Sequence, residues 1–255
     1  MKTKNTVNYY SGTSGLVLPV RNKQAFPPEF QNKTRLCYYG SLFNSIEINS
    51  SFYKIPMAAT VSKWTTEVPP NFRFTFKLWR EITHNKGLAF RMTDVEKFMY
   101  TINQAGDKKG CLLIQFPPSI KSDNVKQLEH LLTAVHMHNP VQWDVAVEFR
   151  HSSWYNEPVY DLLEQYAMGL IIHDMPSSAA PLKVISNDFV YLRFHGPGGN
   201  YRGCYTDDFL HEYAQYISEW QSEGKTVYVY FNNTMGDAVQ NLMSLNRYVA
   251  ANGAG

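Results

Sequence analysis

Charged and polar side chains collect at the ends of several apolar segments in this chain of 255 residues. In the clearest case, Val145 and Val147 alternate with other residues, and Glu148 and Arg150 follow at the end of the segment. This alternation predicts a β-strand, because successive strand side chains point to opposite faces. Sites in parallel sheets and barrels lie at the carboxyl ends of the strands. We therefore expect chemistry at the end of this strand.

Other strand ends carry residues of the same kinds. The candidate site residues at or just beyond them are Glu47, Asn49, Lys77, His84, Gln115, Glu148, Arg150, Asp174, Arg193, His195, Tyr201 and Asn232. Guanidinium groups bind phosphates and carboxylates through paired hydrogen bonds, and lysine adds a compact positive charge. Carboxylates and imidazoles can move protons at neutral pH. Together these residue types fit acid–base chemistry on an anionic compound.

Five of these residues are the candidate catalytic groups: Glu47, Glu148, Lys77, His195 and His84. In this hypothesis one of the glutamates is the general base and one of the histidines donates a proton. Lys77 would form a Schiff base only if burial removed its proton. We expect the nearby carboxylates to keep Lys77 charged instead.

The remaining candidates are expected to bind the substrate: Asn49, Gln115, Arg150, Asp174, Arg193, Tyr201 and Asn232. Arg150, Arg193 and Lys77 together would hold a phosphate or carboxylate. His173 and Asp174 point to opposite faces of their strand, and the sequence leaves open which of them faces inward. Buried charges are costly unless they are paired, so an ion network at these strand ends favours a function over a purely structural role.

Strands and helices that would position these residues alternate along the chain. Strands are expected over residues 5–10, 45–53, 72–77, 111–116, 144–150, 170–174, 189–195 and 226–233, and a loop over 11–15. Helices are expected over residues 34–43, 60–67, 93–104, 123–138, 157–168, 206–223 and 237–250. Pro176 and Pro181 make a short or irregular sixth helix the expectation. This order predicts an α/β fold, a (β/α)8 TIM barrel, with residues 1–255 in a single domain.

The overall composition narrows the class of protein. The 24 basic and 22 acidic residues give a net charge of +2, which argues against a dedicated nucleic-acid or membrane-surface protein. The basic start of the chain is not followed by the apolar segment of a secretory signal, and no run of apolar residues is long enough to span a membrane. Three widely spaced cysteines without metal-ligand spacing fit a reduced, cytoplasmic protein.

A series of short motifs follows in a fixed order along nearly the whole chain. They are Gly12-Thr-Ser-Gly15, Glu47-Ile-Asn-Ser-Ser-Phe-Tyr53, Phe76-Lys77 with Ile82-Thr-His84, Gln115-Phe-Pro-Pro118, Glu148-Phe-Arg-His151, Arg193-Phe-His-Gly196 and Tyr230-Phe-Asn-Asn233. As a set they resemble the YecE-like family, a domain of unknown function with a TIM-barrel fold. The resemblance implies the barrel and assigns no reaction, so function has to be argued from the site.

The sequence is compatible with three functions. The leading hypothesis is a cytoplasmic enzyme that acts on a small anionic substrate, such as a phosphorylated sugar or nucleotide, at the barrel mouth. The first alternative is a metal-dependent hydrolase or phosphodiesterase, with Glu47, Glu148, Asp174 and His195 as ligands that come from separate strands without a diagnostic spacing motif. The second is a protein that binds a ligand at the same mouth without catalysis. No cofactor, metal or oligomeric state is assigned.

Overall fold

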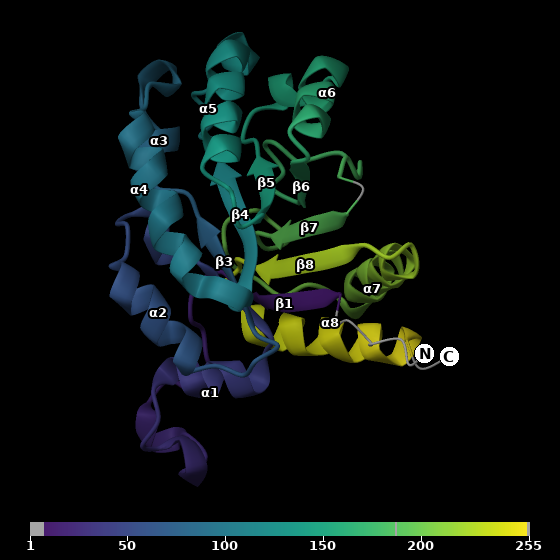
Figure 1. Cartoon of the computed structure of the whole chain (residues 1–255). Helices are drawn as coiled ribbons and strands as arrows, with labels where there is room; N and C mark the ends of the chain where they lie inside the picture. Colours follow the sequence, from purple (N-terminus) through teal and green to yellow (C-terminus); the bar gives the residue numbers. More distant parts are fainter. Residues whose placement is uncertain (1–7, 187, 254–255) are drawn as a thin grey trace, which may run out of the picture.

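A computed structural model describes residues 8–186 and 188–253 of the chain. All eight strands belong to one parallel sheet, in the order β1-β8-β7-β6-β5-β4-β3-β2. A bridge between Ser14 and Glu47 joins the two end strands, so the sheet curls into a barrel. The helices wrap the outside of the strands (Figure 1). This architecture confirms the predicted (β/α)8 barrel.

The strands are short and nearly all of their residues are buried, as expected for parallel strands covered by helices. Their bounds are β1 (Tyr9–Thr13), β2 (Ser45–Ile48), β3 (Arg73–Lys77), β4 (Lys109–Gln115), β5 (Asp144–Glu148), β6 (Gly169–His173), β7 (Phe189–Phe194) and β8 (Thr226–Phe231).

The helices follow the predicted order except for α3, which was not predicted from the sequence. Their bounds are α1 (Arg35–Leu42), α2 (Ala58–Thr66), α3 (Arg80–Thr83), α4 (Met92–Ile102), α5 (Val125–Met137), α6 (Glu157–Gln165), α7 (Asp207–Ser222) and α8 (Ala238–Asn252). Side chains cap several of them, as in α1, where Thr34 Oγ1 accepts the Cys37 N–H at 3.0 Å. Residues 174–186 and 188, the described part of the link from β6 to β7, contain no helix, as the prolines predict.

Two boundary predictions need correction. Residues 11–13 continue β1 instead of forming a loop, and residues 5–7 of the first predicted strand lie outside the described residues. β2 ends at Ile48, because residues 49–52 turn into a short 3₁₀ helix. The early end of β2 places Asn49 at the rim, whereas Glu47 stays inside the barrel.

Side chains close the seam between β1 and β2. The Tyr39 hydroxyl accepts the Thr13 N–H at 2.8 Å and donates to the Ser45 carbonyl at 3.1 Å. Asn44 accepts the Ser11 N–H at 2.9 Å and donates to the Tyr9 carbonyl at 2.8 Å. These bonds satisfy backbone groups that an unpaired strand edge would leave open.

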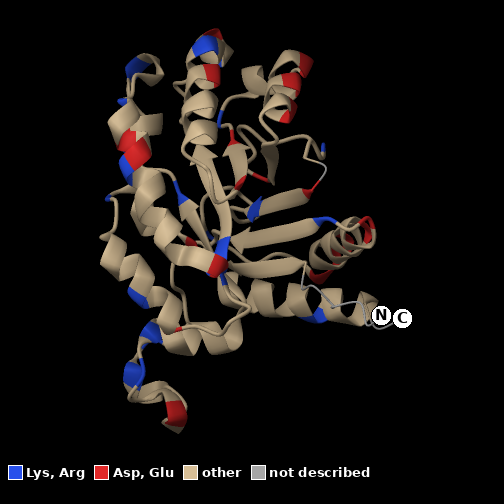
Figure 2. Ribbon diagram, in the orientation of Figure 1, with Lys and Arg blue, Asp and Glu red and all other residues tan. Residues whose placement is uncertain are grey.

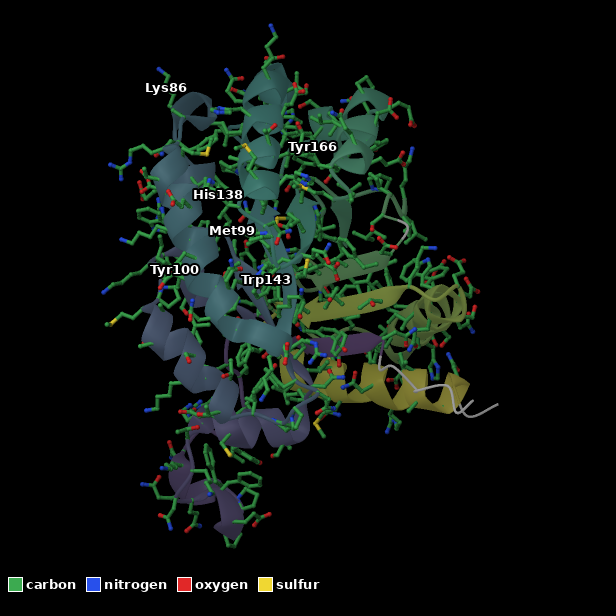
Figure 3. The ribbon with its side chains drawn as sticks, in the orientation of Figure 1. Lys86, Met99, Tyr100, His138, Trp143 and Tyr166 are labelled. Atoms are coloured by element: carbon green, nitrogen blue, oxygen red, sulfur yellow. The ribbon has the colours of Figure 1, made fainter. Side chains whose placement is uncertain are left out.

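Two apolar layers fill the molecule. The inner layer lies within the barrel and consists of Tyr10, Cys111, Leu113, Ala146, Ile171, Phe189, Tyr191, Tyr228 and Tyr230. A larger outer layer packs the strands against the helices. On α4, for example, Met99 points inward and is 1% exposed, whereas its neighbour Tyr100 points away and is 65% exposed (Figure 3).

Charged residues of both signs are distributed around the ribbon (Figure 2). This distribution agrees with the near balance of basic and acidic residues in the sequence. Within residues 8–186 and 188–253, no helix combines the length and the apolar character needed to cross a bilayer.

Candidate functional site

The carboxyl ends of the strands surround a cavity of about 470 Å³. Its lining residues are Asn49, Tyr53, Lys77, His84, Gln115, Pro117, Pro118, Arg150, Met175, Ser177, Arg193, Tyr201, Asn232, Thr234 and Met235. Lys77 and Gln115 are the last residues of β3 and β4, and Asn232 follows β8 directly. The cavity therefore occupies the end of the barrel where sites of this fold lie.

An ion network forms the floor of this cavity. Arg193 binds both carboxylate oxygens of Glu47, with Nε 2.9 Å from Oε2 and Nη2 2.8 Å from Oε1. Its Nη1 donates to Glu148 Oε2 at 3.0 Å. Both glutamates are fully buried, and Arg193 is 1% exposed. Ser14 and Tyr191 donate further hydrogen bonds to Glu47, so this carboxylate has no free side facing the cavity.

Both glutamates are ionised in this network. Burial alone would raise the pKa of Glu47, but the charge and hydrogen bonds of Arg193 outweigh it and lower the pKa. For Glu148 the burial effect is outweighed by Arg150 and Arg193, which hold its pKa well below the usual range. Neither carboxylate can act as a base at neutral pH without losing an arginine partner.

Arg150 completes the floor beside the same carboxylate. Its Nε donates to Glu148, and its Nη2 lies 2.8 Å from His195 Nε2. A third contact joins its Nη1 to the sulfur of Met175. Arg150 and Arg193 were expected to cradle a substrate anion, but most of their N–H groups already bind Glu47, Glu148 and His195.

His195 is held in its neutral form. Its Nε2 accepts hydrogen bonds from Arg150 at 2.8 Å and from Arg193 at 3.0 Å, so this nitrogen carries the lone pair. The Nδ1–H then faces Asp174 Oδ1 at 3.4 Å. Burial and, to a smaller extent, the charges of Arg193 and Arg150 together lower the pKa of His195 to about 4, against the opposing effects of Glu148 and Asp174. His195 is fully buried beneath the cavity.

The question of His173 and Asp174 is answered by the strand register. His173 shares a face of β6 with Ile171, which belongs to the inner apolar layer, so His173 has the inward register. Its Nε2 lies 3.0 Å from the Phe149 carbonyl and 3.1 Å from the Tyr155 hydroxyl. Asp174 accepts the backbone N–H of His195 at 2.7 Å and supports that residue from the neighbouring strand.

Lys77 differs from the other charged groups of the site. Its side chain is almost buried, and its Nζ lies 4.0 Å from the centre of the Phe52 ring. Within the described part of the chain, Nζ has no hydrogen bond and no ion pair. Ser51 fixes the backbone of Lys77, since its Oγ accepts the Lys77 N–H at 3.1 Å and donates to the Lys77 carbonyl at 2.7 Å.

The nearby carboxylates do not keep Lys77 fully charged, in contrast to the expectation from the sequence. Burial lowers the pKa of Lys77 to about 7, the charges of Arg193 and Arg150 add to this effect, and Glu148 and Glu47 only partly oppose it. The physical reason is that each glutamate is already neutralised by an arginine. Lys77 is therefore close to half protonated at neutral pH.

The neutral groups of the rim complete the cavity. His84 is half-buried, with Nδ1 2.8 Å from Thr83 Oγ1, and burial together with Lys77, Arg80 and Arg150 lowers its pKa to about 4. Asn49 Oδ1 is buried and has no hydrogen-bond partner among the described residues. The Tyr201 ring lies 5.9 Å from the ring of His195.

The structure separates the predicted site residues by depth. Those that line the cavity are Asn49, Lys77, His84, Gln115, Arg150, Arg193, Tyr201 and Asn232. Those that lie beneath or beside it are Glu47, Glu148, Asp174 and His195. Sequence reasoning missed several lining residues in loops, among them Met175, Thr234 and Met235. The only signal for these residues was that each follows a strand end.

The four side chains considered as metal ligands do not form a metal site. Among the described residues, no group of three or more His, Cys, Asp or Glu side chains is arranged to hold a metal ion. Arg193 and Arg150 occupy the carboxylates of Glu47 and Glu148, as the ion pairs show. A cation at this position would have to displace both arginines.

The closed parallel barrel with a polar mouth defines a protein of the TIM-barrel class. The chain belongs to the family described as protein of unknown function DUF72, whose model matches residues 10–255. The UPF0759 protein YunF of Bacillus subtilis (strain 168) is 30% identical over 249 residues, which cover 85% of this chain and 86% of that protein. The UPF0759 protein YecE of Escherichia coli (strain K12) is 26% identical over 122 residues, covering 48% of this chain and 43% of that protein.

Solved structures of the family have the same fold. A DUF72 family protein from Enterococcus faecalis V583 superposes with a TM-score of 0.78 at 21% identity and covers 95% of both chains. A DUF72 family protein from Thermotoga maritima MSB8 gives a TM-score of 0.70 at 25% identity, covering 95% of this chain and 99% of that chain. These matches confirm the family resemblance and the barrel.

Proposed function

We propose that the protein is an enzyme that acts on a small anionic compound by acid–base chemistry at the barrel mouth. The observation that carries the proposal is the unpaired amine of Lys77, which opens on the cavity and has a pKa of about 7. A group that titrates near the working pH exchanges protons most effectively. Lys77 therefore takes the role of general base or acid in place of Glu47 and Glu148.

Charge in the site supports an anionic substrate. The two arginines and two glutamates of the floor cancel, so no carboxylate of the floor is left to pair with a protonated Lys77. Among the described residues that line the cavity, none is acidic. A bound anion would favour the protonated form of Lys77 and raise its pKa.

The size and rim of the cavity support a small polar substrate. A volume of about 470 Å³ suits a metabolite such as a phosphorylated sugar or nucleotide. Tyr53 and Tyr201 offer exposed ring faces beside the opening, on which a sugar or base can stack.

We also propose a domain organisation and a cellular location for the protein. We place residues 1–255 in one domain, which is supported by the membership of all eight strands in one sheet. We also place the protein in the cytoplasm, which is supported by the free thiols of Cys37, Cys111 and Cys204.

Calorimetric titration with inorganic phosphate tests the anion site. At pH 7 the wild-type protein should bind phosphate with uptake of a fraction of a proton, detected by comparing buffers of different ionisation enthalpy. Lys77→Met should weaken binding by about tenfold or more, because a charged hydrogen bond is lost. Lys54→Met, at an exposed lysine near the rim, is the matched control and should bind like wild type.

Turnover separates catalysis from simple binding. Sugar phosphates that bind should incorporate solvent deuterium in the presence of wild-type protein and not with Lys77→Met. Binding without any exchange or product would favour the non-catalytic alternative. Failure of every phosphate compound to bind would contradict the anionic substrate.

A further inference from the structure

Lys77 has the setting of a nucleophile as well as that of a base. Its amine contacts the Phe52 ring at 4.0 Å and makes no hydrogen bond within the described residues. The strand backbone beneath it is fixed through Ser51. An amine without a hydrogen-bonded partner can approach a bound molecule by giving up only its contact with the Phe52 ring.

We propose that Lys77 forms an imine with a carbonyl carbon of the substrate, which is then an aldehyde or ketone that also carries a carboxylate or phosphate. This inference rests on the proposed function and deepens it by naming the substrate class. The carbonyl carbon lies at Lys77 Nζ, and the anionic group occupies the remainder of the positively charged mouth.

The reaction balances without an oxidant or reductant. The lone pair of Nζ forms a bond to the carbonyl carbon, and the electron pair of the C=O double bond moves to oxygen. One N–H proton passes to that oxygen, giving a carbinolamine. The hydroxyl group then leaves as water with the second proton, and the C=N bond forms. The neutral imidazole of His84, which also lines the cavity, is placed to carry protons between these atoms.

The charges around Lys77 determine how much of its amine is unprotonated. The charged and titratable groups around Lys77 are Glu47 on β2, Arg80 on α3, His84 after it, Glu148 and Arg150 at the end of β5, and Arg193 on β7. Both carboxylates are paired with arginines, so neither can hold the ammonium form. At a pKa of about 7, roughly half of the Lys77 amine is neutral at pH 7, compared with roughly 0.04% for an ordinary lysine.

An imine at this position would explain why a lysine is used. Once protonated, the imine nitrogen withdraws electrons from the adjacent carbon, which loses a proton or a carbon–carbon bond more readily. The reaction class is therefore proton transfer or bond cleavage next to a carbonyl group. Because the floor itself is balanced, the anionic group of the substrate would offset the positive charge of the protonated imine.

Reductive trapping with glyoxylate tests the inference, because this probe carries an aldehyde and a carboxylate in one small molecule. Wild-type protein is treated at pH 7 with limiting glyoxylate and sodium cyanoborohydride, and the modified peptides are mapped by mass spectrometry. We expect Lys77 to be carboxymethylated about 1,000-fold faster than Lys54, from the difference in free amine. Inorganic phosphate should slow the modification of Lys77 and leave that of Lys54 unchanged.

The outcomes distinguish this inference from the proposed function. Modification of Lys77 no faster than that of Lys54 overturns the imine, and if Lys77→Met still weakens phosphate binding, the proposed anion site stands. Rapid trapping at Lys77 that phosphate does not affect supports the imine and contradicts the shared anion site. Because the mapping uses wild-type protein, the result does not depend on how well a variant folds.

Discussion

Lys77 and Glu148 share the barrel mouth, but their buried charges have different roles. Glu148 binds two arginines and stays ionised, so its charge is fully used within the protein. Lys77 has no such partner among the described residues, and burial makes its protonated form costly. Such a cost is common at functional sites, where stability is given up for reactivity.

Lys77→Met should therefore stabilise the protein at pH 7 by about 2–4 kcal/mol. Between its ordinary pKa of 10.5 and its folded pKa of about 7, the unfolded chain binds a proton that the folded protein does not. Stability is lost as the pH falls through this window, and the gain from Lys77→Met should shrink as the pH rises towards 10. Urea unfolding at pH 7 and pH 10 measures the difference, with Lys54→Met as the control. Equal stability of wild type and Lys77→Met at pH 7 would contradict the low pKa.

Glu148→Gln should have the opposite effect and destabilise the protein by about 3–5 kcal/mol. The substitution leaves Arg150 and Arg193 buried with one carboxylate fewer between them. Glu157→Gln is the matched control, because Glu157 pairs with Lys183 on the surface and should matter by less than about 1 kcal/mol. Denaturant unfolding of the two variants compares them directly. A similar small loss for both would show that the floor network is not needed for stability.

Among the elements of the fold, the loop 196–203 and the seam between β1 and β2 position residues of the site. The loop 196–203 carries Tyr201 over the cavity, and Gly196 in this loop has a φ of 95°. A Cβ at Gly196 would overlap the Arg202 carbonyl, so only glycine allows this close return of the chain. The seam between β1 and β2 holds Glu47 in place through its bridge to Ser14.

Tyr39→Phe tests the seam. Loss of the hydroxyl leaves the Thr13 N–H and the Ser45 carbonyl without their partner, which should lower stability by about 1–3 kcal/mol. Tyr38→Phe, at the adjacent residue, is the matched control, because the Tyr38 hydroxyl makes no hydrogen bond among the described residues. Urea unfolding and hydrogen exchange of the Thr13 amide measure the effect. Unchanged exchange at Thr13 in Tyr39→Phe would mean that the hydroxyl does not close the seam.

For the whole molecule, the buried titratable groups of the mouth all lower the stability of the fold as the pH falls. Glu47 and Glu148 have lowered pKa values, so their contribution is complete above about pH 4.5 and is lost as the pH falls further. His84 and His195 have pKa values of about 4, so between pH 6.5 and 4 the unfolded chain binds protons that the folded protein does not. Acidification therefore removes stability at every one of these groups.

The stability of the protein should consequently decline as the pH falls from 8, first through Lys77, then through the histidines below about pH 6.5, and more steeply below about pH 4.5. Urea midpoints measured from pH 8 to pH 4 follow this decline. His195→Gln, which keeps a neutral hydrogen-bonding side chain, should reduce the slope between pH 6.5 and 4. A midpoint that stays constant from pH 7 to pH 5 would contradict the neutral histidines.

Much of this architecture could be predicted from the sequence, because the alternation of apolar strands and helices fixes a barrel and places strand ends at one mouth. The depth of each side chain could not be predicted. Glu47 and Arg193 meet across 146 positions of sequence, and only the closed barrel brings them together. The lowered pKa of Lys77 depends on that pairing, which no spacing in the sequence reveals. Loop residues such as Met175 and Met235 carry no periodic pattern at all.

Among the described residues that line the mouth, Lys77 supplies the one unpaired amine that titrates near neutral pH. Competitive labelling with trace acetic anhydride, followed residue by residue across pH by mass spectrometry, measures this most directly. We expect labelling of Lys77 to rise with a midpoint near pH 7, whereas Lys54 should react only at much higher pH. Labelling of Lys77 and Lys54 with the same midpoint near pH 10 would contradict it.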